Sequence, residues 1–173
     1  MERDASSVSE EALREIFDRI TREVTENSVG IQLVQNDFSP GDDLYTVHVN
    51  FERGFHSSLS LRADRTMLTR LAQSMLQTEE VTAQDLEDVT KEYFNVLCGR
   101  IARALYEATH IAARFDVPSF HRGTFSPAQQ EEQFVISYSS GRNGSAQLVH
   151  HVPSQLQDKL DEELNITERG DME

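Results

Sequence analysis

The residues with the clearest chemical potential in this sequence are a carboxylate and an amide three positions apart, Glu92 and Asn95, in the segment KEYFNVLCGR (91–100). In a helix, residues three apart are neighbours on one surface, so both side chains can reach the same point outside the protein. A carboxylate can pair with a cation, whereas a carboxamide can accept a hydrogen bond from water and donate one nearby. Gly99 follows one turn later, although Gly costs about 1 kcal/mol relative to Ala in an exposed helix interior.

A long helix over about residues 84–110 is predicted to present these groups to solvent. At 100° per residue, the two faces of this helix separate clearly. The predicted core face consists of Val96, Val89, Tyr93, Leu97, Ala108, Ile101, Phe94, Leu105 and Cys98. The opposite face carries Asp88, Glu92, Asn95, Gly99 and Ala102, with Arg103 and Tyr106 at its border.

Gly99 and Ala102 leave a nearly bare patch beside the Glu–Asn pair, and such a patch suits the close approach of another molecule. A helix that had only to be soluble would favour Lys, Glu or Arg there. A Glu and an Asn three apart on a solvated face also arise by chance, so both interpretations stay open at this point.

The remaining elements predict an α+β fold, with a mainly antiparallel sheet covered by helices. A helical stripe runs through about residues 7–27, and strands are expected at about 29–38, 44–52 and 55–62. A short helix capped by Asp64 follows, and Thr82 or Asp85 can start the long one. The last predicted elements are a strand at 113–120 and a hairpin over 131–152 that turns at GRNG. This order contains few βαβ units, which argues against a parallel sheet.

The length of 173 residues fits one domain with a tail. We expect the domain to span residues 1–153 and an acidic helix and tail to span residues 154–173. No run approaches the roughly 18 apolar residues of a membrane span, and no apolar signal core begins the chain, so the expected location is cytoplasmic. The net charge of −14 argues against nucleic acid or an anionic membrane as partner and favours a protein with basic groups.

No metal site or nucleophile of the protein's own is expected. Cys98 is the single cysteine, so one chain can form neither a disulfide nor a cysteine metal site, and its place on the core face predicts an unreactive thiol. His150 and His151 are adjacent in a predicted strand and point to opposite faces. Ser57 and Ser58 have no His and Asp at a spacing that indicates a catalytic triad.

The stretch EYFNVLCG resembles the signature of the CheC/CheX family of chemotaxis phosphatases, which is a Glu, two residues, an Asn, and a Gly one turn on. Similarity extends to GFHSSLSLRADRTMLTRLAQSML before it and IAARFDVPSFHRG after it, and covers about residues 10–152. The CheC branch carries two such motifs. In the first helix here, Glu23 and Asn27 are four apart and off the pattern, so the chain looks like the CheX branch. Tyr93 and Phe94 replace the small residues often found between Glu and Asn, but both are predicted to face the core.

The resemblance implies a phosphatase that removes the phosphoryl group from the aspartate of a response-regulator receiver domain of the CheY kind. Asn95 would then orient the attacking water and Glu92 would contact the receiver's lysine, while the receiver supplies Mg²⁺. Gly99 and Ala102 would admit the receiver's loops, and Asp88, Arg103 and Tyr106 would border the contact. Asp88 is also explained as a solvated surface charge.

The resemblance further implies a homodimer, which would carry two sites per particle. Two other functions stay open. One is a non-catalytic CheX-like dimeric adaptor that binds a receiver or a signalling scaffold. The other is an unrelated α+β ligand-binding domain with a deep pocket away from the long helix.

Overall fold

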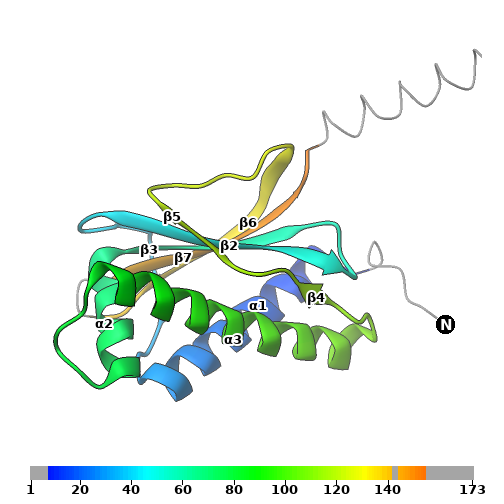
Figure 1. Ribbon diagram of the computed structural model, residues 1–173. Helices are drawn as coiled ribbons and strands as arrows, with labels where there is room; N and C mark the ends of the chain where they lie inside the picture. The colour runs from blue at the N-terminus through cyan, green and yellow to red at the C-terminus, as the bar shows by residue number, and fades with distance from the viewer. Residues whose placement is uncertain (1–7, 142–143, 155–173) are drawn as a thin grey trace, which may run out of the picture.

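The computed structural model describes residues 8–141 and 144–154, which form an α+β fold (Figure 1). Its helices are α1 (Glu10–Val29), α2 (Arg65–Leu76) and α3 (Ala83–Thr109). Its strands are β1 (Val34–Gln35), β2 (Leu44–Arg53), β3 (Ser58–Asp64), β4 (Arg114–Phe115), β5 (Ser119–Arg122), β6 (Gln130–Ser139) and β7 (Ser145–Pro153). The predicted tail helix over 155–173 and the central hairpin residues 142–143 lie outside the described residues.

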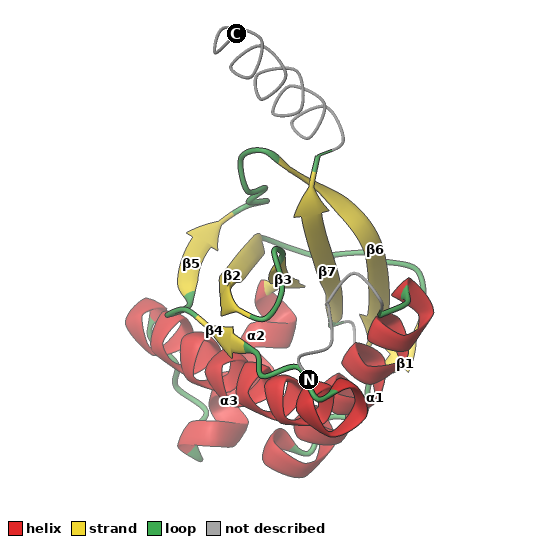
Figure 2. Cartoon of the chain, turned by 90° about the vertical axis from the view of Figure 1, so that its right-hand side faces the viewer, coloured by secondary structure: helices red, strands yellow, loops and turns green. Residues whose placement is uncertain are grey.

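All strand pairs are antiparallel, as predicted, in the order β1-β6-β7-β3-β2-β4, and β5 also pairs with β2. The sheet is curled, and the helices pack on one of its faces (Figure 2). Inward-facing strand residues such as Leu59, Leu61 and Leu148 meet Phe17 of α1 and Phe94 of α3 in one core. Within the described ranges, no helix is long and apolar enough to cross a membrane.

Thr82 starts α3, and Asp85 completes a reciprocal cap. The Thr82 hydroxyl accepts a hydrogen bond from the Asp85 backbone N–H at 3.0 Å, and the Asp85 carboxylate accepts one from the Thr82 N–H at 3.1 Å. Both residues that the sequence offered as helix starts therefore take part, in a capping box. The helix ends at Thr109, and the next residue, His110, has a left-handed φ of 58°.

Two residues of the predicted core face of α3 are exposed instead. Val96 is 41% exposed, because it lies at the border of the buried arc next to the polar stripe. Ala108 is exposed in the final turn, beyond Leu105, the last large core side chain of the helix. Thr90 and Ala104 are buried, although the prediction did not include them.

Two strand predictions were too long. Of residues 29–38, only Val34–Gln35 form a strand, because α1 extends to Val29 and Gly30 ends it with a φ of 67°. The strand predicted over 113–120 is split into β4 and β5. Asp116 bonds to β2 through its side chain at the break, and Pro118 has no N–H to donate to a ladder. This interruption forms one wall of the site described next.

Candidate functional site

The polar stripe of α3 is exposed to solvent, as predicted. Glu92, Asn95, Asp88, Gly99 and Arg103 are exposed, Tyr106 is 53% exposed, and Ala102 is half-buried. No atom lies within 4 Å of the position that a Gly99 Cβ would occupy, so the surface at this point is open. This face of α3 therefore presents the Glu–Asn pair and, one turn later, a flat surface without large side chains.

Asp88, Glu92 and Asn95 line a shallow groove of about 420 Å³ between α3 and residues 114–118. Lys91 of α3 and Glu52 at the end of β2 complete the lining. The other four predicted contact residues, Gly99, Ala102, Arg103 and Tyr106, lie on the helix outside this groove. Arg103 lines a separate hollow between α1 and α3, where it pairs with Glu107 at 3.3 Å. Tyr106 packs edge-on against His110, with ring centroids 6.0 Å apart.

Glu92 and Asn95 have no hydrogen bond or ion pair with any residue in the described part of the chain. Most polar side chains around them are already engaged. Asp88 accepts from Gln84 at 2.9 Å, and Glu52 pairs with Arg114 at 3.3 Å. The carboxylate and the amide of the predicted pair are therefore free to bind an incoming molecule.

The wall opposite α3 is held by Asp116. Its carboxylate accepts from the backbone N–H of Asn50 at 2.7 Å and from the Asn50 side-chain amide at 3.0 Å. The Asp116 N–H donates to the Asn50 carbonyl at 2.9 Å. Val117 lies at the tip of this wall and is 86% exposed, so the groove carries an apolar side chain beside its polar floor.

Sequence reasoning did not assign this wall to the site. The sequence predicts the segment RFDVP only as part of a strand. The proline in it is nevertheless a signal for an edge strand or an interruption. The segment's contact with Asn50 joins residues 66 apart, and no local pattern predicts that.

The floor beneath the pair is tied to α1 by a buried hydrogen bond. Tyr93 follows Glu92 and points inward, where its hydroxyl hydrogen-bonds to the hydroxyl of Thr25 on α1. Burial raises the pKa of Tyr93 to about 12, so the hydroxyl stays protonated and the bond persists at neutral pH. Thr25 also donates to the Thr21 carbonyl at 2.6 Å. This link fixes α3 against α1 directly behind the Glu–Asn pair.

Cys98 takes no part in the exposed surface. The side chain is 2% exposed, and burial raises the pKa of its thiol well above the ordinary value. It therefore remains a neutral thiol in the core, in line with the prediction of an unreactive thiol.

The histidines lie away from the groove. As predicted, His150 and His151 face opposite sides of the sheet: His150 packs on Phe17 and Phe134, and His151 contacts His48 with ring centroids 5.8 Å apart. Sequence reasoning missed this second contact. Among residues 8–141 and 144–154, no group of three His, Cys, Asp or Glu side chains is arranged to hold a metal ion.

The structure combines an α+β fold with an exposed Glu–Asn pair on its longest helix. The family model described as chemotaxis phosphatase CheX matches residues 45–139. The chain belongs to this family, and the resemblance noted in the sequence is confirmed. Family membership also excludes the unrelated ligand-binding domain that the sequence left open.

Solved structures of CheX proteins share the fold. The chemotaxis protein CheX from Vibrio vulnificus has a TM-score of 0.65 at 17% identity, covering 83% of this chain and 98% of that one. CheX from Desulfovibrio desulfuricans has a TM-score of 0.62 at 17% identity, covering 80% and 97%. The CheX–CheY–BeF₃–Mg²⁺ complex from Borrelia burgdorferi gives 0.66 at 14% identity, covering 81% and 96%. A search of curated protein sequences finds no match.

Proposed function

We propose that this protein hydrolyses the phosphoaspartate of a response-regulator receiver domain of the CheY kind, with Asn95 and Glu92 as the residues that act on it. The observation that carries the proposal is the pair itself. Both side chains are exposed on α3 and line one groove, and neither has a partner in the described part of the chain.

Asn95 is suited to position the attacking water. Phosphoryl transfer needs little covalent help from the protein, because in-line placement of the nucleophile and charge stabilisation account for most of the rate. A neutral amide oxygen accepts a hydrogen bond from water without adding negative charge near the phosphoryl oxygens. An amide fulfils this role better than a carboxylate, which would repel the phosphoryl group.

Glu92 is suited to anchor the partner. An exposed carboxylate one turn from the amide can pair with a lysine of the receiver and thereby set the position of Asn95. We propose that the receiver, and not this chain, supplies Mg²⁺ to the phosphoryl group. The Borrelia burgdorferi structure, which contains CheX, CheY, BeF₃ and Mg²⁺, supports a receiver as the partner class.

The same resemblance leads us to propose a homodimer. Two-fold pairing of one exposed surface is the commonest arrangement in soluble oligomers. Sedimentation at micromolar concentration should give about twice the chain mass of 19.7 kDa. A single 19.7 kDa species at that concentration would reject the dimer.

The decisive experiment follows the lifetime of the acyl phosphate on receivers from the same cell, with catalytic amounts of the protein. Asn95→Ala should abolish the acceleration but retain receiver binding. Because Ala is the better helix former, this exposed substitution should raise helix stability by a few tenths of a kcal/mol. Glu92→Ala should weaken both binding and rate, since it removes a charge-assisted contact.

Asn27→Ala is the matched control, because Asn27 is an exposed asparagine on α1, outside the groove. It should leave the rate unchanged. Near wild-type turnover by Asn95→Ala would reject the mechanism. If the wild type binds a receiver but leaves every phosphoryl lifetime unchanged, the protein is an adaptor.

A further inference from the structure

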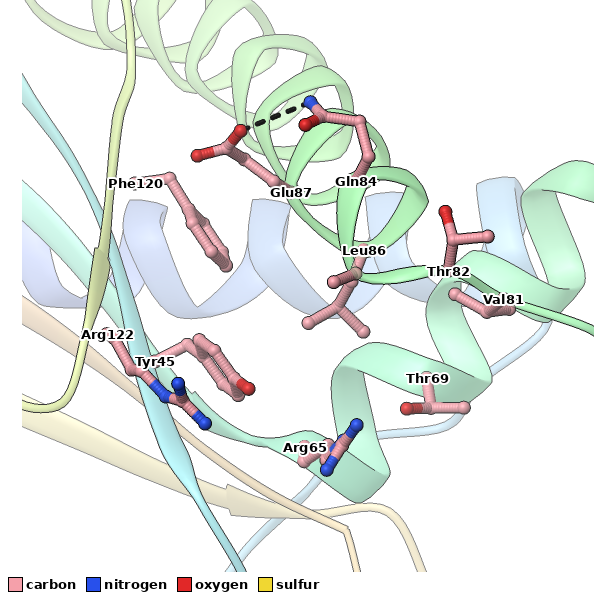
Figure 3. A pocket seen from close by; sticks show the side chains of 11 residues that line it. Tyr45, Arg65, Thr69, Val81, Thr82, Gln84, Leu86, Glu87, Phe120 and Arg122 are labelled. Atoms are coloured by element: carbon pink, nitrogen blue, oxygen red, sulfur yellow. Dashed lines mark hydrogen bonds between the residues drawn. The ribbon is translucent and has the colours of Figure 1, made fainter.

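A second recess, of about 580 Å³, lies where α2 and the beginning of α3 meet strands β2 and β5 (Figure 3). Its volume falls within the range of about 300–1,000 Å³ that is typical of small-molecule sites. It shares no lining residue with the groove of Glu92 and Asn95. The phosphatase proposal does not use it.

Two guanidinium groups lie at one end of this recess, those of Arg65 at the start of α2 and Arg122 at the end of β5. Arg65 forms no ion pair with any of the residues that the structure describes. Among the described residues, Arg122 pairs only with Asp43, at 3.7 Å, and both side chains of that pair are more than half exposed. An exposed pair of this kind contributes little energy, so an anion can replace it.

Backbone donors line a third part of the recess, at the start of α3 (Figure 3). Ala83 and Gln84 occupy the first two positions of α3 and line the recess. Their N–H groups have no acceptor within the helix, because the first-turn amides lack a preceding carbonyl. The Thr82 side chain satisfies only the N–H of Asp85. These donors, like the two guanidinium groups, can bind an anion, against the opposing net charge of −14.

Aromatic rings form the middle of the recess. Tyr45 and Phe120 come from the paired strands β2 and β5, and their rings stack with centroids 5.5 Å apart and 20° between planes. Leu86 of α3 lies across from them (Figure 3). A flat heterocycle can extend such a stack, which is the way aromatic side chains bind nucleobases.

A carboxylate lies at the other end. Glu87 enters the recess beside Phe120, away from the two arginines (Figure 3). One of its oxygens accepts from Gln84 at 3.3 Å, and the other lies 4.0 Å from the Lys91 ammonium. Guanine presents two adjacent donors on one edge, N1–H and N2–H₂, that match the two oxygens of a carboxylate. Adenine offers only one donor on the corresponding edge.

From this arrangement we propose that the recess binds a guanine nucleotide. The base stacks on Tyr45 and Phe120 and donates to Glu87, while the phosphates bind Arg65 and Arg122. Each contact pairs a group of the ligand with a protein group of opposite charge or of matching shape. A single anion such as phosphate would leave the rings and Glu87 unused.

Isothermal titration calorimetry of the full chain with GDP, ADP, guanosine and inorganic phosphate tests the proposal. GDP should bind at least about tenfold more tightly than each of the others. ADP lacks the contact with Glu87, guanosine lacks the phosphate contacts, and inorganic phosphate lacks both the stacking and the Glu87 contact. Arg65→Gln and Arg122→Gln together should weaken GDP by about tenfold or more. Glu87→Gln should remove the preference for GDP over ADP but leave ADP affinity nearly unchanged.

Arg103→Gln is the matched control, because it removes an exposed arginine of α3 outside the recess and should leave GDP affinity unchanged. Melting temperatures of all variants identify any loss of folding. No heat of binding with millimolar GDP would overturn the proposal. Equal affinities for GDP and ADP would do so as well, and so would GDP binding that survives the double arginine substitution.

Discussion

The carboxylate of Asp116 accepts two hydrogen bonds from Asn50, at 2.7 Å from the backbone N–H and at 3.0 Å from the side-chain amide. One side chain thereby fixes the interruption between β4 and β5 against β2. This contact and the short, irregular pairing of β4 with β2 together position the wall of the groove opposite Asn95.

We therefore expect Asp116→Ala to lower receiver dephosphorylation several-fold through weaker receiver binding. The segment 114–118 loses two bonds to Asn50, while the exposed site lets water replace them, so stability should fall by only about 1 kcal/mol. Receiver affinity and urea unfolding measure the two effects separately. Asp37→Ala, at an exposed aspartate outside the groove, is the control and should change neither. Unaltered receiver affinity in Asp116→Ala would mean that the wall does not contact the partner.

Gly99 provides a test in which stability and function are expected to change in opposite directions. Gly99→Ala should stabilise the protein by about 0.5–1 kcal/mol, because the position is helical and open. Gly99→Gln should also raise the melting temperature, but its long side chain should obstruct the approach of the receiver and reduce turnover at least tenfold. Thermal unfolding and phosphoryl lifetime are the measurements. If Gly99→Gln dephosphorylates the receiver at the wild-type rate, the bare patch is not part of the interface.

Because two histidines are buried, we expect the free energy of unfolding to fall in mild acid. Burial, with a smaller repulsion from His151, lowers the pKa of His150 to about 4, and burial with repulsion from His48 and Arg62 lowers that of His151 to about 4. The ring of His150 is neutral and donates to the Gln133 amide oxygen at 2.7 Å. An unfolded histidine has a pKa near 6.5.

Above about pH 6.5 these rings are neutral in both states and stability is at its plateau. Between about pH 6.5 and 4 the unfolded chain binds protons that the folded chain does not, so the free energy of unfolding falls as pH falls. The slope approaches about 1.4 kcal/mol per pH unit for each histidine. Urea unfolding from pH 7.5 to 4.5 measures it. His150→Gln should be less stable at pH 7.5 and show a shallower slope, whereas the exposed-site control His56→Gln should keep the wild-type slope. An identical slope in His150→Gln would contradict this assignment.

The long helix and its polar stripe were predictable from sequence because they depend on local chemistry. Periodicity and the Thr82–Asp85 cap set α3 within a residue or two of its observed ends. Asp64 was likewise predictable as the cap of α2, where it accepts from the Met67 N–H at 2.9 Å. The Glu92–Asn95 spacing followed from the helix alone.

The groove and the second recess depend on contacts that no local pattern encodes. Asp116 meets Asn50 across 66 positions, and Tyr45 stacks on Phe120 only because β5 pairs with β2. Likewise, His48 and His151 meet through Ser60, whose hydroxyl lies 2.7 Å and 3.1 Å from their ring nitrogens. Predicting such pairs from sequence requires the strand order, which the sequence leaves undetermined.

The ion pair between Glu87 and Lys91 spans the two surfaces of α3, because Glu87 lines the recess and Lys91 lines the groove. A ligand in the recess that binds Glu87 changes the charge that Lys91 presents to a partner at Glu92 and Asn95. By thermodynamic reciprocity, a partner that binds Lys91 changes the affinity of the recess for its ligand by the same factor. The strength of this pair limits the coupling. Its side chains are 39% and 34% exposed, and a solvated pair contributes at most about 1 kcal/mol. Through this ion pair, occupancy of one site can therefore change affinity at the other by no more than about fivefold. The pair can adjust binding at the second site but cannot turn it on or off.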